Sequence, residues 1–379
     1  MRDPGREPKR DRGREPDHEA NPEANPEPEP EPDREQGPGE VPAPVSALRR
    51  IAFLLERTRA ETYKVKAFRG AAATVLALDP DELRDRHRAG TLRELPGVGA
   101  SSEAVIVAAL DGEVPSYLAT LEEEASGPLA TGGEVLREQL QGDLHSHSDW
   151  SDGGSPIEEM VFTAIEVGHR YLALTDHSPR LTVANGLSPQ RLGRQLQVVD
   201  AINEHLAGSF RLLRGIEVDI LDDGSLDQTE EMLGRLDVVV ASVHSKLKME
   251  PAAMTRRMVA AVSHPRTNVL GHCTGRLVTG GRGTRPQSRF DAAAVFEACA
   301  AHDVAVEINS RPERMDPPDD LIAVALEAGC LFSIDSDSHA PGQLDFLDHG
   351  CARAVALGVP AERVVNTWDV DRLLAWSSG

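Results

Sequence analysis

Apolar residues follow three different patterns along the 379-residue chain. Residues 1–45 carry almost none, and proline, glutamate and arginine dominate there. From residue 46 to residue 124, apolar residues recur at the three- and four-residue spacing of helices. From residue 140 onward, short apolar runs typical of buried strands alternate with helical stretches. We therefore predict a tail, an all-α domain, a linker over residues 125–139, and an α/β domain over residues 140–379.

The tail is predicted to be disordered. A segment with so few apolar side chains cannot bury enough surface to offset the conformational entropy that it would lose on ordering. The apolar share of the whole chain is nevertheless 40%, so a sizeable core is expected in the rest.

A glycine-containing turn interrupts the helical segment at residues 95–99, which read LPGVG. Glycines permit a sharp turn there, and backbone N–H groups at the start of the following helix favour a phosphate. The turn is either an ordinary helix–helix connection or a helix-hairpin-helix that binds the DNA backbone without reading sequence. The helix after it is poor in lysine and arginine, so DNA binding should be weak. The candidate DNA-backbone contacts are Gly97, Gly99, Lys64, Lys66 and Arg69.

Side chains that can bind metals follow the strand-like runs of the α/β segment. At residues 142–154, GDLHSHSDWSDGG, two histidines stand two apart and so share one face of a strand. Six of the thirteen histidines occupy such strand ends. Because the carboxyl ends of parallel strands meet at one rim, we expect these side chains to lie together. One histidine after a strand is ordinarily structural, but this repetition indicates a shared site for divalent metals.

The order of these short motifs resembles that of the PHP family, named for polymerases and histidinol phosphatases. The resemblance covers about residues 140–376 and is closest to the PHP domain of bacterial family X DNA polymerases, through pieces such as residues 306–316 and 336–354. It implies a distorted barrel of seven β/α units and a site for three divalent metals, Mn²⁺, Zn²⁺ or Fe²⁺. The implied ligands are His145, His147, Asp152, His177, Glu217, His244, His272, Asp337 and His339.

The helical segment resembles the N-terminal helical domain of family X DNA polymerases, through residues 51–56, 68–72 and 95–99. In such a polymerase, a catalytic palm would stand between this domain and a later PHP domain. Here only residues 125–139 separate the two segments. That length leaves no room for a palm, so we expect a hydrolase of phosphate esters and not a polymerase.

Three functions remain open at this point. The first is a phosphoesterase acting on DNA, as a 3′→5′ exonuclease or in 3′-end processing during repair. The second is a small-metabolite phosphatase similar to histidinol phosphatase, which the net charge of −22 favours. The third is a non-catalytic DNA-binding protein. A hydroxide activated by the metals would be the nucleophile, with Arg276 and Arg311 as candidate phosphate contacts; the alternative for each arginine is an ordinary ion pair.

The four cysteines are widely spaced and form no CxxC pair, which indicates a reduced, cytoplasmic protein without disulfides. We find no apolar run long enough to cross a membrane and no secretory signal. The sequence predicts neither an oligomeric state nor the identity of the metal.

Overall fold

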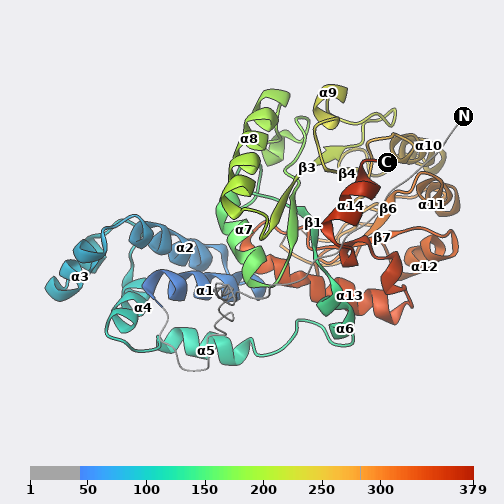
Figure 1. Cartoon of the computed structure of the whole chain (residues 1–379). Coiled ribbons are helices and arrows are strands. Elements are labelled where there is room, and N and C mark those ends of the chain that lie inside the picture. The colour runs from blue at the N-terminus through green and yellow to red at the C-terminus, as the bar shows by residue number, and fades with distance from the viewer. Residues whose placement is uncertain (1–42, 282) are drawn as a thin grey trace, which may run out of the picture. The chain divides into compact units, whose positions relative to one another are not determined.

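Seven parallel strands, paired in sequence order, form the centre of the α/β segment in this computed structural model (Figure 1). The structure describes residues 43–281 and 283–379, which belong to one compact unit. The strand-like runs recognised in the sequence are confirmed as strands. They are β1 (Gly142–Ser146), β2 (Tyr171–Leu174), β3 (Arg211–Asp219), β4 (Val238–Ser242), β5 (Val269–Leu270), β6 (Ala305–Asn309) and β7 (Phe332–Asp335).

The first and last strands meet, so the sheet nearly closes into a barrel. Ser146 forms a parallel bridge with Ser338, just after β7. The backbone N–H of His147 donates to the Ser338 carbonyl at 2.8 Å, and the N–H of Leu144 donates to Oδ1 of Asp335 at 2.9 Å. The predicted distorted (β/α)7 barrel is therefore confirmed.

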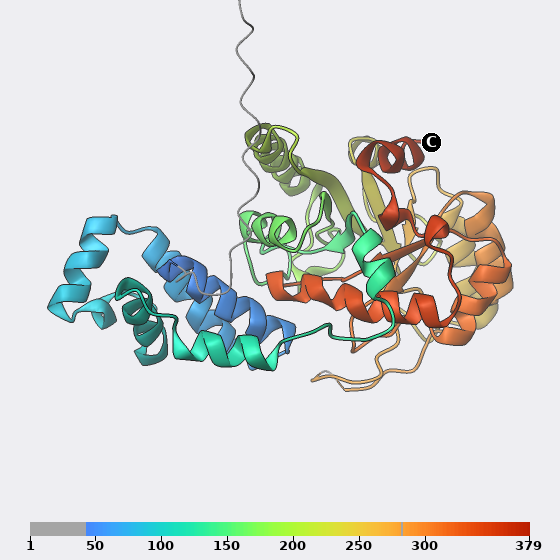
Figure 2. The ribbon, with the colours of Figure 1, turned by 60° about the horizontal axis from the view of Figure 1, so that its bottom comes forward.

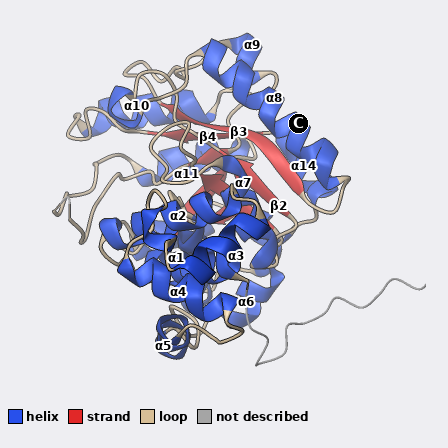
Figure 3. Cartoon of the chain, turned by 90° about the vertical axis from the view of Figure 1, so that its left-hand side faces the viewer, coloured by secondary structure: helices blue, strands red, loops and turns tan. Residues whose placement is uncertain are grey.

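Helices cover the barrel on the outside, as Figure 3 shows with strands in red and helices in blue. They are α7 (Ile157–Glu166), α8 (Pro189–Leu206), α9 (Glu230–Leu233), α10 (Pro251–Val262), α11 (Ala292–Ala301), α12 (Asp319–Glu327), α13 (Leu347–Ala356) and α14 (Val370–Ser377). Because the strands are buried on both faces, they read as nearly continuous apolar runs, as in VVVAS of β4. No helix within the described ranges is long and apolar enough to cross a membrane.

The N-terminal helices enclose an apolar cluster of their own, which includes Leu48, Ile51, Phe68 and Ile106. The helices are α1 (Pro44–Arg57), α2 (Thr62–Leu76), α3 (Pro80–Ala89), α4 (Ala100–Leu110) and α5 (Ser116–Glu124), with a short 3₁₀ turn η1 (Leu92–Glu94). The expected LPGVG turn joins η1 to α4, with Gly97 at a φ of 75°.

Two boundaries differ from those expected. Helix α1 begins at Pro44, and the rest of the predicted disordered tail, residues 1–42, lies outside the described residues. Within the predicted linker, α6 (Glu134–Gln139) forms and packs beside α13 (Figure 2). The contact is close, because a Cβ on Gly133 would lie 2.4 Å from the backbone N of Ala352.

Candidate metal centre

The nine predicted metal ligands lie together at the carboxyl-terminal rim of the barrel. Their ligand atoms form four overlapping groups, each within 4.8 Å. One group holds His147, Asp152, His177 and His339; the others hold His145, Glu217 and His272; His145, His147 and Asp337; and His177, Glu217 and His244. Strands β1, β2, β3, β4, β5 and β7 or the loops after them supply these side chains.

Glu217 of β3 lies at the centre of the cluster. Its Oε1 is 2.8 Å from Nε2 of His272 and 3.2 Å from Nε2 of His244. Its Oε2 is 2.8 Å from Nδ1 of His177 and 3.4 Å from Nε2 of His145. A buried carboxylate between four imidazoles is well placed to bridge two cations.

The chemistry of these donors fits divalent metals. Among the described residues, neither oxygen of Glu217 and neither ring nitrogen of His147 or His244 has a hydrogen-bond partner, although all are buried. Burying such atoms without a partner costs free energy. A cation bound between them would supply the missing partner for all of them. Six imidazoles with three carboxylates suit Mn²⁺, Zn²⁺ or Fe²⁺ better than a hard cation such as Mg²⁺.

Burial and the neighbouring carboxylates shift the pKa values of the histidines in opposite directions. Burial lowers the pKa of His177, but the Glu217 and Asp152 carboxylates outweigh burial and raise it to about 10. Burial lowers the pKa of His272 to about 4. Burial and the neighbouring imidazoles of His339 and His177 hold the pKa of His147 well below its ordinary value. In the metal-free chain, a proton on His177 therefore supplies part of the charge that balances Glu217.

A second set of residues, which the sequence analysis does not include among the nine ligands, orients the proposed ligands. Glu307 of β6 accepts a hydrogen bond from Nδ1 of His145 at 2.6 Å. Nδ2 of Asn309 and Nε of Arg314 both donate to Oδ2 of Asp337, at 3.1 and 3.0 Å. Carboxylates and amides that hold metal ligands in this way fix ring tautomers and ligand orientation.

The two predicted phosphate contacts have different surroundings. Arg311 borders the cluster, because its Nη1 donates to the Asp337 carbonyl at 2.7 Å and lies 2.8 Å from Nδ1 of His339. Arg276 does not join the cluster. Its guanidinium donates to the carbonyls of Arg314 and Met315. The interpretation of Arg276 as a phosphate contact is therefore not supported, and Arg314 is the better candidate.

Of the predicted DNA contacts on the N-terminal helices, some are accessible to a phosphate and one is not. Lys64 and Lys66 are exposed on α2, and Gly97 and Gly99 flank the turn before α4. Arg69 is not available to a phosphate, because its guanidinium bonds both oxygens of buried Glu56 and reaches Glu159. Arg69 lies on the side of α2 that faces α1. The spacing of basic residues in the sequence does not show which of them face the neighbouring helix.

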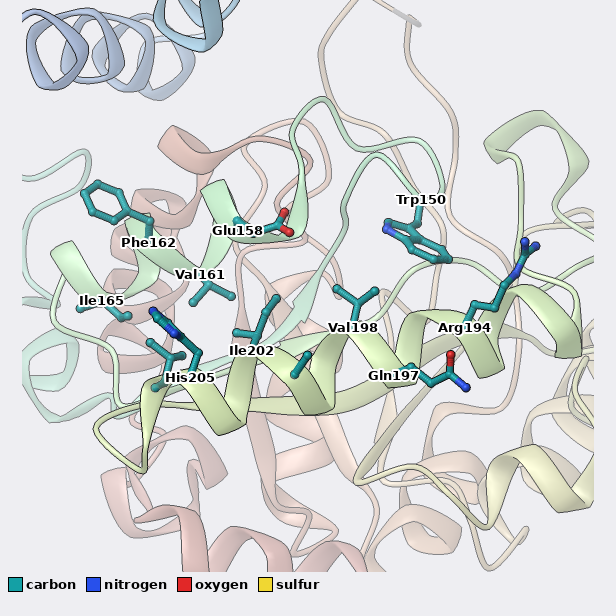
Figure 4. Close-up of a pocket in the computed structure, with 12 residues that line it drawn as sticks. Trp150, Glu158, Val161, Phe162, Ile165, Arg194, Gln197, Val198, Ile202 and His205 are labelled. Carbon is teal, nitrogen blue, oxygen red and sulfur yellow. The ribbon is translucent and has the colours of Figure 1, made fainter. Parts of the chain in front are cut away.

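An apolar groove of about 750 Å³ runs between α7 and α8 (Figure 4). Its lining includes Phe162, Val198 and Ile202, together with Trp150 from the loop that carries Asp152. None of the nine clustered side chains lines it. The groove is therefore separate from the candidate metal centre.

Comparison with known proteins finds similarities in the α/β segment. Residues 143–311 match the family model of the PHP domain. The chain is 36% identical over 228 residues to the DNA polymerase/3'-5' exonuclease PolX of Bacillus subtilis, a match that covers 60% of this chain and 39% of that protein. The chain thus spans about two fifths of that relative's length.

Two further matches extend over most of the other protein. A probable phosphatase of Serratia proteamaculans is 29% identical over 239 residues, which are 59% of this chain and 89% of that protein. Among solved structures, the histidinol phosphate phosphatase of Lactococcus lactis, complexed with zinc, L-histidinol and phosphate, is 20% identical with a TM-score of 0.43, covering 58% of this chain and 94% of that one.

Proposed function

We propose that the chain carries a PHP domain and is a metal-dependent phosphoesterase that acts on the 3′ ends of DNA. The observation that carries the proposal is the buried Glu217 carboxylate, which lies among imidazoles with neither oxygen hydrogen-bonded by a described residue. We propose the nine clustered residues as ligands for three divalent ions, Mn²⁺, Zn²⁺ or Fe²⁺.

The chemistry follows from a cluster of this kind. When bound, closely spaced divalent ions lower the pKa of water and neutralise the charge that develops on a departing oxygen. Glu307 holds Nδ1 of His145 and so directs Nε2 into the cluster. Arg311 and Arg314 place two positive charges at the edge that carries Asp337. Arginines in that position suit the binding of a phosphate ester.

Two features favour DNA as the substrate. The exposed Lys64 and Lys66 and the turn at Gly97 offer a site for a phosphate backbone on the N-terminal helices. In addition, the relative from Bacillus subtilis is named a 3'-5' exonuclease, and the match covers 60% of this chain.

The second candidate is a phosphatase for a small ester such as histidinol phosphate. It is favoured by the net charge of −22, which opposes the approach of a polyanion. The match to the probable phosphatase, which covers 89% of that protein, points the same way.

One experiment separates the candidates. Purified chain with Mn²⁺ is incubated with single-stranded DNA labelled at its 5′ end and, separately, with histidinol phosphate. We expect a ladder of DNA shortened from the 3′ end, absent with His145→Ala. Phosphate release from the small ester with the DNA intact would replace the DNA proposal by the second candidate. Activity on neither substrate would favour a DNA-binding protein without catalysis.

A further inference from the structure

Helix α1 contacts the barrel at the segment that directly follows the proposed ligand His339. This segment is the 3₁₀ helix η3 (Pro341–Phe346). The backbone N–H of Gly342 donates to Oε2 of Glu56 at 2.8 Å, and Nε of Arg57 donates to Oδ2 of Asp345 at 2.8 Å. Glu56 and Arg57 are both buried, so these bonds lie inside the contact between α1 and η3.

Gly342 shows how close that contact is. A Cβ at this position would lie 2.2 Å from the carbonyl O of Phe53 and 2.7 Å from Cβ of Glu56. Gly342 is not among the glycines with positive φ, so its backbone conformation is open to any residue. The glycine is therefore needed for the approach of η3 to α1 and not for the turn itself.

The N-terminal helices also hold the loop that carries Asp152. Arg69 bridges Glu56 of α1 to Glu159 on α7, the helix that follows this loop, at 2.8 and 3.1 Å. Arg49 of α1 pairs with the same Glu159. The loop is in turn bound to the ligand segment, because the N–H of Gly154 donates to the carbonyl of His339 at 2.7 Å.

These contacts converge on one of the metal pockets. Asp152 and His339 have side chains 34% and 21% exposed, whereas those of His145, His147 and Glu217 are at most 1% exposed. The two exposed ligands lie on the loops that follow β1 and β7. Contacts from the N-terminal helices should therefore affect the positions of Asp152 and His339 more than those of the buried ligands.

We infer that α1 is a positioning element for the pocket formed by His147, Asp152, His177 and His339, and that its docking on η3 sets the affinity of that pocket for its metal. The inference rests on the proposed metal site. Its positioning residues are Glu56 and Gly342, which touch neither metal nor substrate and act through the loops that carry Asp152 and His339.

The test compares three variants of the full chain. Gly342→Ala introduces the clash with α1. Glu56→Gln removes the negative charge of the carboxylate that accepts hydrogen bonds from the Gly342 N–H and from Arg69. Gly70→Ala on α2 is the control, since a Cβ there would meet nothing within 4 Å. Each protein is stripped of metal and titrated with Mn²⁺ alone, and free ion is followed by electron paramagnetic resonance, with circular dichroism to report folding.

We expect Gly342→Ala and Glu56→Gln to bind one equivalent of Mn²⁺ about tenfold or more weakly, with the remaining equivalents and Gly70→Ala unchanged. If Gly342→Ala does not fold, Glu56→Gln alone gives the result. Unchanged titrations in the folded variants, or equal weakening of every equivalent, would overturn the inference while leaving the proposed function intact. A wild-type chain that binds no Mn²⁺ would overturn both.

Discussion

Nδ1 of His145 lies 2.6 Å from Oε1 of Glu307, and both side chains are fully buried. The contact joins β1 to β6, across the strands of the barrel. The second oxygen of Glu307 accepts the backbone N–H of His272, so one carboxylate orients two of the proposed ligands. The imidazole of His145 is thereby held with Nε2 toward Glu217, 3.4 Å away.

We predict that Glu307→Gln weakens metal binding. Glutamine supplies an uncharged oxygen, so the ring of His145 becomes less basic and its orientation less fixed. Loss of such an outer partner costs about 10- to 100-fold in metal affinity. Competition with a chromogenic chelator measures the affinity, with Glu204→Gln, exposed on α8, as the control. Equal affinities for the two variants would show that Glu307 does not support the ligands.

His169 should make the chain sensitive to mild acid. It is 4% exposed, neither ring nitrogen is hydrogen-bonded by a described residue, and burial, with Arg137 nearby, lowers its pKa to about 3. The unfolded chain binds the proton near pH 6.5. Stability from the neutral ring is thus present above pH 6.5 and is lost as the pH falls toward 3.

Replacing His169 by leucine removes this titration. Between pH 7.5 and pH 5, the wild type should lose about 2 kcal/mol more of its free energy of unfolding than His169→Leu does. Urea denaturation at both pH values measures the difference, and the other titrating groups cancel because the two proteins share them. A difference between the two proteins that does not change with pH would contradict the prediction.

The double variant Lys64→Ala/Lys66→Ala should bind single-stranded DNA more weakly. Each lost phosphate contact reduces the dependence of log affinity on log salt by about 0.7, so the slope should fall by about 1.4. Fluorescence anisotropy at several salt concentrations measures it. Arg266→Ala, an exposed cation before β5 at the opposite end of the barrel, is the control. An unchanged slope in the double variant would place the DNA elsewhere.

The barrel was predictable because its signals are local. Most of the strands read as apolar runs because they are buried on both faces. Every strand except β6 carries a proposed ligand or is followed by one within a few residues, as His244 follows β4. Helix α3 gives no such signal, because only Leu83 is buried. It depends instead on the Asp79 cap and on Gly90, which adopts a left-handed conformation at its end.

The direction of long side chains was not predictable. The sequence makes Arg69 and Arg276 candidate phosphate contacts, but both guanidinium groups bond to other parts of the chain. The role of Glu307 depends on the distance in space between β1 and β6. His145 and Glu307 are 162 positions apart in the sequence. Such pairings depend on tertiary register, which one sequence without relatives does not supply.

We propose that metals held around Glu217 are required for the hydrolysis of phosphate esters of DNA. The most direct measurement is the rate at which 5′-labelled single-stranded DNA is shortened by chain treated with a chelator and then returned to Mn²⁺. We predict that chelation abolishes the reaction, that Mn²⁺ restores it in wild type and Glu204→Gln, and that Glu217→Gln stays at least about a hundredfold slower. Shortening that persists after chelation, or in Glu217→Gln at the wild-type rate, would contradict the claim.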